Sequence, residues 1–199
     1  VVRAERGATG KNFIPCPRAY IHPKIDGIIT SYFEWSSATR YVPNPEFGSM
    51  HRAGHILMSC FYYGFSETDL FLRIDLDPLA TENLASLELE IIFPLKNRKL
   101  LSNILLLQGE ATSRFSEIGD THEDHATPEI PQSGGSRVSY RKVLEVAIPF
   151  SSLSCKADDR LEFFLVIQPP GGIGERWPMY GTFSAELPGI DFTERMWEA

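Results

Sequence analysis

The 199 residues are enough for one domain with its own hydrophobic core, and a composition of 43% hydrophobic and 23% charged residues is typical of a folded globular protein. Because 26 acidic residues outnumber 19 basic ones and give a net charge of -7, neither nucleic acid nor an anionic membrane is expected as a partner. No apolar run approaches the roughly 20 residues of a membrane-spanning helix.

The first part of the chain shows little periodicity. Residues 1–19 are expected to form a leader or linker. Residues 30–41 are the best candidate for a helix or irregular helical turns, because Phe33, Ser37 and Tyr41 recur at a spacing of four and a serine or threonine at the start can cap the first turn.

From residue 55 onward, apolar residues alternate with polar ones as in half-buried strands. Residues 55–64 and 70–76 predict a β-hairpin, because they are separated only by a short polar turn. Residues 78–84 can form one helical turn, and further strands are expected at 85–93 and 99–108.

Residues 109–136 are acidic, rich in turn residues and poor in apolar ones, which predicts a long surface loop with at most a poor strand at 113–118. Single strands are then expected at 137–148, 161–168 and 180–187. Many short strands with few helices predict one all-β domain over residues 1–199. The expected fold is a two-sheet antiparallel β-sandwich, jelly-roll-like, with one or two short helices.

The chain contains three cysteines: Cys16, Cys60 and Cys155. An odd number without C-x-x-C spacing predicts buried free thiols rather than disulfides or a zinc site. Free thiols suit a reducing compartment, and no signal-sequence pattern follows Val1, so a cytoplasmic location is expected. Since the first residue is not methionine, we expect the domain to be a fragment of a larger protein.

Two polar clusters contain residue types that could carry chemistry. His122 and His125 do not form an H-E-x-x-H pattern and lie in the predicted loop, so neither a metal nor another cofactor is expected. Asp75 and Asp77 could hold calcium or act as the acid and base of a glycosidase, although a charged face turned to solvent is the preferred interpretation. No G-x-S-x-G motif is present, and no catalytic residue is predicted.

The aromatic residues provide the remaining candidate site. Trp177 and Tyr180 follow a Pro-Gly-rich break at residues 169–172, which predicts that they lie in a loop beside Glu175 and Arg176. The apolar face of a sugar can pack on such a ring while neighbouring charged groups bond its hydroxyls. The alternative is that these rings fill the core of the sandwich.

Three stretches together resemble a known family. They are HPKIDG at 22–27 with YFEW at 32–35, MHRA at 50–53 with FYYGF at 61–65 and LFLRID at 70–75, and LEVAIPFSSL at 144–153 with ERWP at 175–178. This combination resembles the C-terminal domain of glycoside hydrolase family 57 proteins. More loosely, it is similar to family 9 carbohydrate-binding modules and DOMON-like sandwiches.

The resemblance covers residues 20–198 and implies a β-sandwich attached to an α-glucan-processing enzyme, whose catalytic acids lie in a separate domain. Family 9 modules hold a sugar between two tryptophans. Trp177 matches the later one, whereas Phe61, Tyr62 and Tyr63 stand where the earlier one is expected.

The expected function is therefore that of a non-catalytic accessory domain of a glycoside hydrolase. It would bind carbohydrate weakly through Trp177, Tyr180, Glu175 and Arg176, or pack against the parent catalytic domain. Two alternatives stay open: a structural or interaction module without a ligand, and a standalone glycosidase that uses the paired aspartates.

Overall fold

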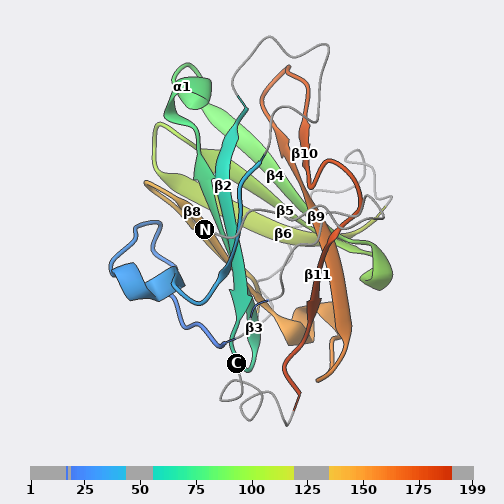
Figure 1. The fold of residues 1–199 in the computed structure, drawn as a ribbon. Helices are drawn as coiled ribbons and strands as arrows, with labels where there is room; N and C mark the ends of the chain where they lie inside the picture. The colour runs from blue at the N-terminus through green and yellow to red at the C-terminus, as the bar shows by residue number, and fades with distance from the viewer. Residues whose placement is uncertain (1–16, 18, 44–55, 119–134, 190–199) are drawn as a thin grey trace, which may run out of the picture.

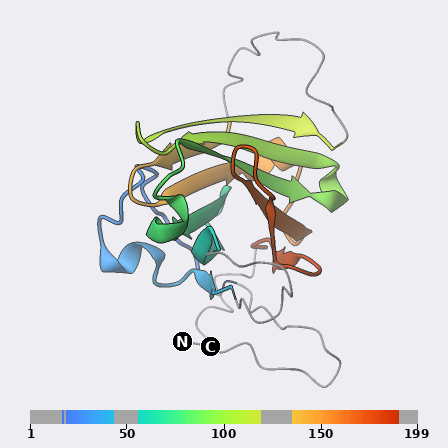
Figure 2. The same ribbon diagram turned by 90° about the horizontal axis from the view of Figure 1, so that it is seen from above.

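A computed structural model describes residues 17, 19–43, 56–118 and 135–189 as two antiparallel β-sheets packed face to face (Figure 1). The first sheet has the strand order β1-β2-β3-β8-β7, and the second has the order β10-β9-β4-β5-β6, with β11 also paired to β9. The two layers are separated in the view from above (Figure 2). The predicted all-β, two-sheet antiparallel sandwich is confirmed.

The strands are β1 (Thr39–Tyr41), β2 (Met58–Phe65), β3 (Asp69–Leu76), β4 (Ser86–Phe93), β5 (Arg98–Leu105), β6 (Glu110–Glu117), β7 (Arg137–Tyr140), β8 (Leu144–Pro149), β9 (Arg160–Gln168), β10 (Glu175–Trp177) and β11 (Phe183–Glu186). The helical turns are η1 (Tyr32–Trp35), α1 (Pro78–Thr81), η3 (Pro94–Lys96) and η4 (Phe150–Leu153). The predicted hairpin corresponds to β2 and β3, and the predicted helical turn corresponds to α1.

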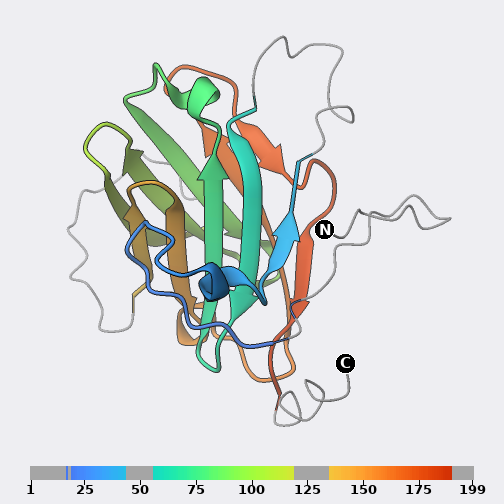
Figure 3. The same ribbon diagram turned by 60° about the vertical axis from the view of Figure 1, so that its left-hand side comes forward.

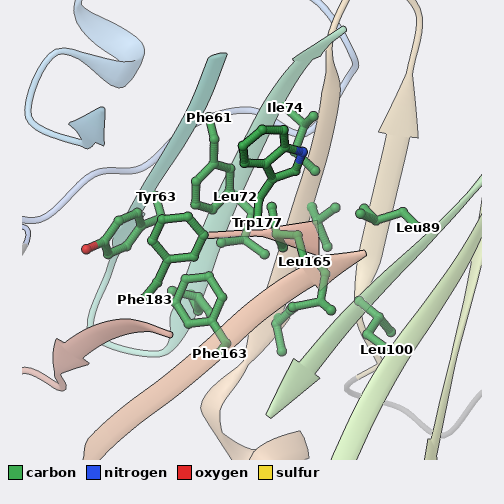
Figure 4. Close-up of a cluster of buried hydrophobic side chains, with 14 of the residues drawn as sticks. Phe61, Tyr63, Leu72, Ile74, Leu89, Leu100, Phe163, Leu165, Trp177 and Phe183 are labelled. Atoms are coloured by element: carbon green, nitrogen blue, oxygen red, sulfur yellow. The ribbon is translucent and has the colours of Figure 1, made fainter. Parts of the chain in front are cut away.

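The inner faces of the sheets meet in an aromatic core. The rings of Phe61, Tyr63, Phe163 and Phe183 are fully buried, and every pair of them has ring centroids between 4.8 and 6.2 Å apart (Figure 4). Centroid spacings in this range are those at which aromatic rings attract one another. Period-two alternation places these rings inward, because successive side chains of a strand point to opposite faces.

The first sheet is covered on its outer face as well. Ile21 and Trp35 come from the N-terminal segment, residues 19–43, and form a second apolar cluster with Phe71 and Ala147 of the sheet. Figure 3 shows this segment, coloured blue, lying across the first sheet. Strands β3 and β8 are therefore buried on both faces, which explains their nearly continuous burial.

Two predictions for the second half of the chain are wrong. The loop expected at 109–136 begins instead with strand β6, which pairs with β5 along all eight of its residues. Its side chains are exposed or half-buried because it lies at the end of the strand order, so it lacks the apolar residues that mark a core strand. Residues 119–134 lie outside the described residues.

The single strand expected at 137–148 is a hairpin of β7 and β8. A three-residue turn separates the strands and keeps Tyr140 opposite Leu144, so the apolar parity continues across the turn and imitates one long strand. The turn is held from outside the hairpin, because the carbonyl oxygen of Gly27 accepts hydrogen bonds from the amides of Lys142 and Val143.

The helix expected at 30–41 is only the four-residue turn η1, followed by β1. The hydroxyl of Ser31 caps this turn by accepting a hydrogen bond from the amide of Phe33, as the sequence suggested. The chain leaves the helical path after Trp35, because Thr39–Tyr41 pairs with β2 at the edge of the sheet.

Two neighbouring phenylalanines of β9 test the division between the inner and outer face. Replacing Phe163 by alanine removes a fully buried ring and is expected to lower the free energy of unfolding by roughly 3–5 kcal/mol. Phe164→Ala, the matched control, removes a half-buried ring beneath Arg176 and should cost only about 1 kcal/mol. Urea unfolding measures both, and equal losses would contradict the assigned faces.

Candidate functional site

The four residues predicted to form a sugar site do not lie together. Trp177 is 3% exposed and Glu175 is 5% exposed, because both point inward from strand β10. Figure 4 shows the Trp177 ring within the aromatic core. The predicted loop position of Trp177 is therefore wrong: the turn-rich residues end just before β10, and alternation within this short strand directs its first and last side chains into the core.

Glu175 has a structural role that its sequence context did not reveal. Both of its carboxylate oxygens accept a hydrogen bond from the amide of Leu57, at 2.9 and 3.0 Å, and Oε2 also accepts one from Nε1 of Trp177 at 3.2 Å. A buried carboxylate requires such donors. Glu175 and Trp177 thus stabilise the fold, and neither side chain presents a surface to a ligand.

Arg176 and Tyr180 point away from this core. The guanidinium carbon of Arg176 lies 4.1 Å from the ring centroid of Phe164, and the side chain donates hydrogen bonds to the carbonyl oxygens of Pro178 and Gly181. These bonds hold the turn that carries Tyr180, whose side chain is 80% exposed. Tyr180 is thus an exposed ring, separated from the tryptophan that was expected beside it.

The other candidate residues are also engaged in structural contacts. Asp75 accepts two hydrogen bonds from Arg73, each 2.7 Å long, and Asp77 caps α1 by accepting from the amides of Leu79 and Ala80. Neither aspartate lines either of the two clefts described below. The histidine cluster of residues 122–125 and the first cysteine, at position 16, lie outside the described residues.

A different feature, which we call the N-terminal cleft, is large enough to receive a small ligand. It is an open cleft of about 470 Å³ formed by the segment that covers the first sheet. Pockets for small ligands occupy roughly 300–1,000 Å³. Its walls include Tyr20, His22, Lys24, Thr30, Phe33 and Glu34.

Exposed aromatic rings stand at this cleft. Phe33 lines it and is 77% exposed, and the neighbouring Tyr32 is 86% exposed. The two rings meet edge to face with centroids 5.4 Å apart. Both belong to η1, whose last residue, Trp35, is buried against the sheet. The turn therefore anchors one ring and leaves two others in solvent.

The polar groups of the cleft are held in place by one another. The Glu34 carboxylate accepts hydrogen bonds from the amides of Lys24 and Thr30, at 2.8 and 3.1 Å, and from the Thr30 hydroxyl at 3.2 Å. Nε2 of His22 lies 3.0 Å from the Glu67 carboxylate. These contacts order a wall that carries both hydrogen-bond donors and acceptors.

The basic groups of the cleft are paired with carboxylates. The Lys24 ammonium lies 2.9 Å from the Asp26 carboxylate and holds the pKa of Asp26 below its usual range. The backbone of Glu67 and the imidazole of His22 likewise lower the pKa of the Glu67 carboxyl. Asp26, Glu34 and Glu67 thus place three carboxylates beside one ammonium and one imidazole, so the cleft has no excess of positive charge with which to select an anionic ligand.

A second, smaller cleft of about 310 Å³ lies at the β2–β3 turn, between Thr68 and Phe150. Cys155 lines it, but burial raises the pKa of its thiol, so the sulfur stays protonated at neutral pH. A protonated thiol is a poor nucleophile. This cleft therefore offers less chemistry than the N-terminal cleft.

Comparison with known proteins adds no assignment. No protein-family model matches the chain, and no curated protein was found to be similar to it. Among the described residues, no helix is long and apolar enough to span a membrane. The site must therefore be interpreted from its own geometry.

The different environments of Trp177 and Tyr180 can be measured directly. Trp177→Ala leaves a cavity in the core and is expected to lower the free energy of unfolding by roughly 3–5 kcal/mol. Tyr180→Ala removes an exposed ring and should change it by no more than about 0.5 kcal/mol. Thermal and urea unfolding of both variants measure the difference. A Trp177→Ala variant as stable as the wild-type protein would contradict the buried position of this ring.

Proposed function

We propose that this chain is a non-catalytic accessory domain that binds carbohydrate weakly in the N-terminal cleft, as part of a glycoside hydrolase acting on α-glucans. The observation that carries the proposal is the ring of Phe33, which is exposed on the wall of a cleft whose other walls are polar. This is the combination that a sugar needs, because one face of a pyranose is apolar and its edges carry hydroxyl groups.

The polar atoms around Phe33 suit a neutral ligand. Lys24, Thr30 and Glu34 offer donors and acceptors within one wall, and their charges are already paired or hydrogen-bonded inside the protein. An uncharged sugar can exchange hydrogen bonds with such a surface without leaving a buried charge unpaired. An acidic sugar would find no uncompensated cation here to offset its desolvation.

The resemblance noted in the sequence supports the choice of sugar. Two of the stretches that carry it, residues 22–27 and 32–35, contribute His22, Lys24, Phe33 and Glu34 to the cleft. The same stretches thus provide both the likeness to the family 57 domain and the walls of the candidate site. Maltooligosaccharides are accordingly the first ligands to test.

Removing the ring of Phe33 should weaken binding while the fold is preserved. With one or two contacting rings, we expect the wild-type protein to bind maltooligosaccharides with a dissociation constant on the order of 0.1–1 mM. Phe33→Ala should weaken this at least about tenfold, which is the loss of roughly 1.4 kcal/mol of ring–sugar contact. Calorimetric titration or NMR shift mapping measures both values.

Tyr180→Ala is the matched control, because it also removes a highly exposed ring but one that does not line the cleft. It should leave the affinity unchanged. Equal weakening by both substitutions would place the sugar elsewhere, and no detectable binding by the wild-type protein at 10 mM sugar, about ten times the weakest expected dissociation constant, would reject the proposed function.

Packing against a partner domain is the second candidate function. It is favoured by one observation: Ile29, Tyr32 and Phe33 are all exposed within one short segment and form an apolar patch. Exposed apolar groups tend to associate. If this patch is a docking surface, sedimentation should show concentration-dependent association of the isolated chain, and replacing Tyr32 and Phe33 by serine should remove it.

A further inference from the structure

We propose that Glu145 is a pH-responsive positioning residue for the N-terminal cleft. In this proposal its carboxyl group fastens the segment that forms the cleft to the first sheet, so the ionisation of Glu145 sets how firmly the cleft is held. The effect on ligand affinity rests on the proposed carbohydrate binding, whereas the fastening itself does not.

Glu145 is placed where it can act on the whole segment. It points outward from β8, the same side as Ala147, and is completely buried because the N-terminal segment covers it. Its Oε2 atom accepts hydrogen bonds from the amides of Asp26 and Gly27, at 3.1 and 2.8 Å. Its Oε1 atom accepts one from Nε1 of Trp35 at 3.3 Å.

These three donors flank the part of the cleft wall that carries the exposed ring. Asp26 and Gly27 precede Thr30, and Trp35 follows Phe33 and ends η1. The segment between them is thus attached at both ends to one carboxyl group. In this proposal, loosening that attachment moves Thr30, Phe33 and Glu34 relative to the wall residues that precede Asp26.

Gly27 allows the backbone of the N-terminal segment to approach the β7–β8 turn closely. Its φ angle is +77°, and a Cβ atom at this position would lie 2.6 Å from the backbone nitrogen of Arg141. A side chain would therefore force the segment away from the β7–β8 turn and from Glu145. The contact is built into the fold at the level of the backbone.

Three elements face Glu145, and two of them carry charged groups. Arg73 of β3 stands opposite Glu145 in the sheet register, but its guanidinium is bound by Asp75 of its own strand. From the N-terminal segment, the Glu34 carboxylate repels that of Glu145. Asp26 contributes its backbone amide, and its own carboxylate pairs with Lys24.

From β7, the residue opposite Glu145 is an uncharged serine, Ser139. Hydrogen bonds thus provide most of the stabilisation of the carboxylate, and among the described residues no ion pair joins it to a cation. Burial is the largest influence, and it raises the pKa of Glu145 above its ordinary value despite the three donors.

The direction of the pH effect follows from this rise. When the segment detaches, Glu145 enters water and regains its ordinary pKa, so the attached form binds a proton more tightly than the detached form. This contribution to attachment is complete below the ordinary pKa of a glutamate. It is lost as the pH rises through the raised value, so the cleft should be held most firmly under acidic conditions.

A measurement without ligand tests the fastening. NMR hydrogen exchange should show the protection factors of the Asp26 and Gly27 amides falling severalfold as the pH rises, with the Trp35 indole proton shifting in parallel. Glu145→Gln cannot ionise, and its protection should be independent of pH. Glu175→Gln is the matched control: it alters the other buried glutamate that bonds a tryptophan and should retain the wild-type profile.

A pH-independent protection factor in the wild-type protein would overturn the proposal without recourse to any variant. So would a Glu145→Gln protein that keeps the wild-type profile. These outcomes concern Glu145 alone, because they do not depend on any sugar being bound.

Titration with maltooligosaccharides across the same pH range then tests the coupling. The wild-type affinity should fall severalfold with rising pH, and the Glu145→Gln affinity should not. His22→Gln, measured in parallel, distinguishes a pH effect that arises from His22 in the cleft wall from one that arises from Glu145. If neither the wild-type protein nor a variant binds sugar, but hydrogen exchange depends on pH through Glu145, the proposed function fails and the fastening stands. If sugar binds but hydrogen exchange does not depend on pH, the fastening fails and the proposed function stands.

Discussion

Hydrogen bonds to one buried carboxyl group, that of Glu145, join the N-terminal segment to the first sheet. Removing a carboxylate from water costs on the order of several kcal/mol, and the cost is offset only if donors surround the group. Here the donors are the amides of Asp26 and Gly27 and the indole of Trp35. Segment and sheet therefore depend on each other, and the candidate site exists only while they are joined.

The same device appears in the second sheet. Glu175 is buried and accepts hydrogen bonds from the backbone amide of Leu57 and from the indole of Trp177. Glu145 likewise accepts one from the indole of Trp35. In both places a strand glutamate fixes the chain that leads toward the sheet. Apolar contacts alone are non-directional, whereas a buried acceptor specifies which amide must face it.

Sequence periodicity predicted the central strands well and the margins poorly. The alternation in β3, β4 and β9 was read correctly because each of these strands has a continuous face in the core. Strand β6 was predicted only in part, as a poor strand at 113–118 within a loop, because a strand at the margin of a sheet needs few apolar residues. The β7–β8 hairpin was read as one strand because its odd-numbered turn preserves the parity of the pattern.

The sequence by itself determined an all-β sandwich, because alternating apolar residues must bury one face of each strand whatever the connections between them. It did not identify the candidate region, because the aromatic stretch from Tyr32 to Trp35 was expected to form helical turns and the sugar site was predicted at residues 175–180. Only the tertiary structure decided which rings are accessible. Trp177 enters the core and Phe33 remains in solvent because strand pairing and buried carboxylates orient each segment, and these contacts join residues more than 100 positions apart.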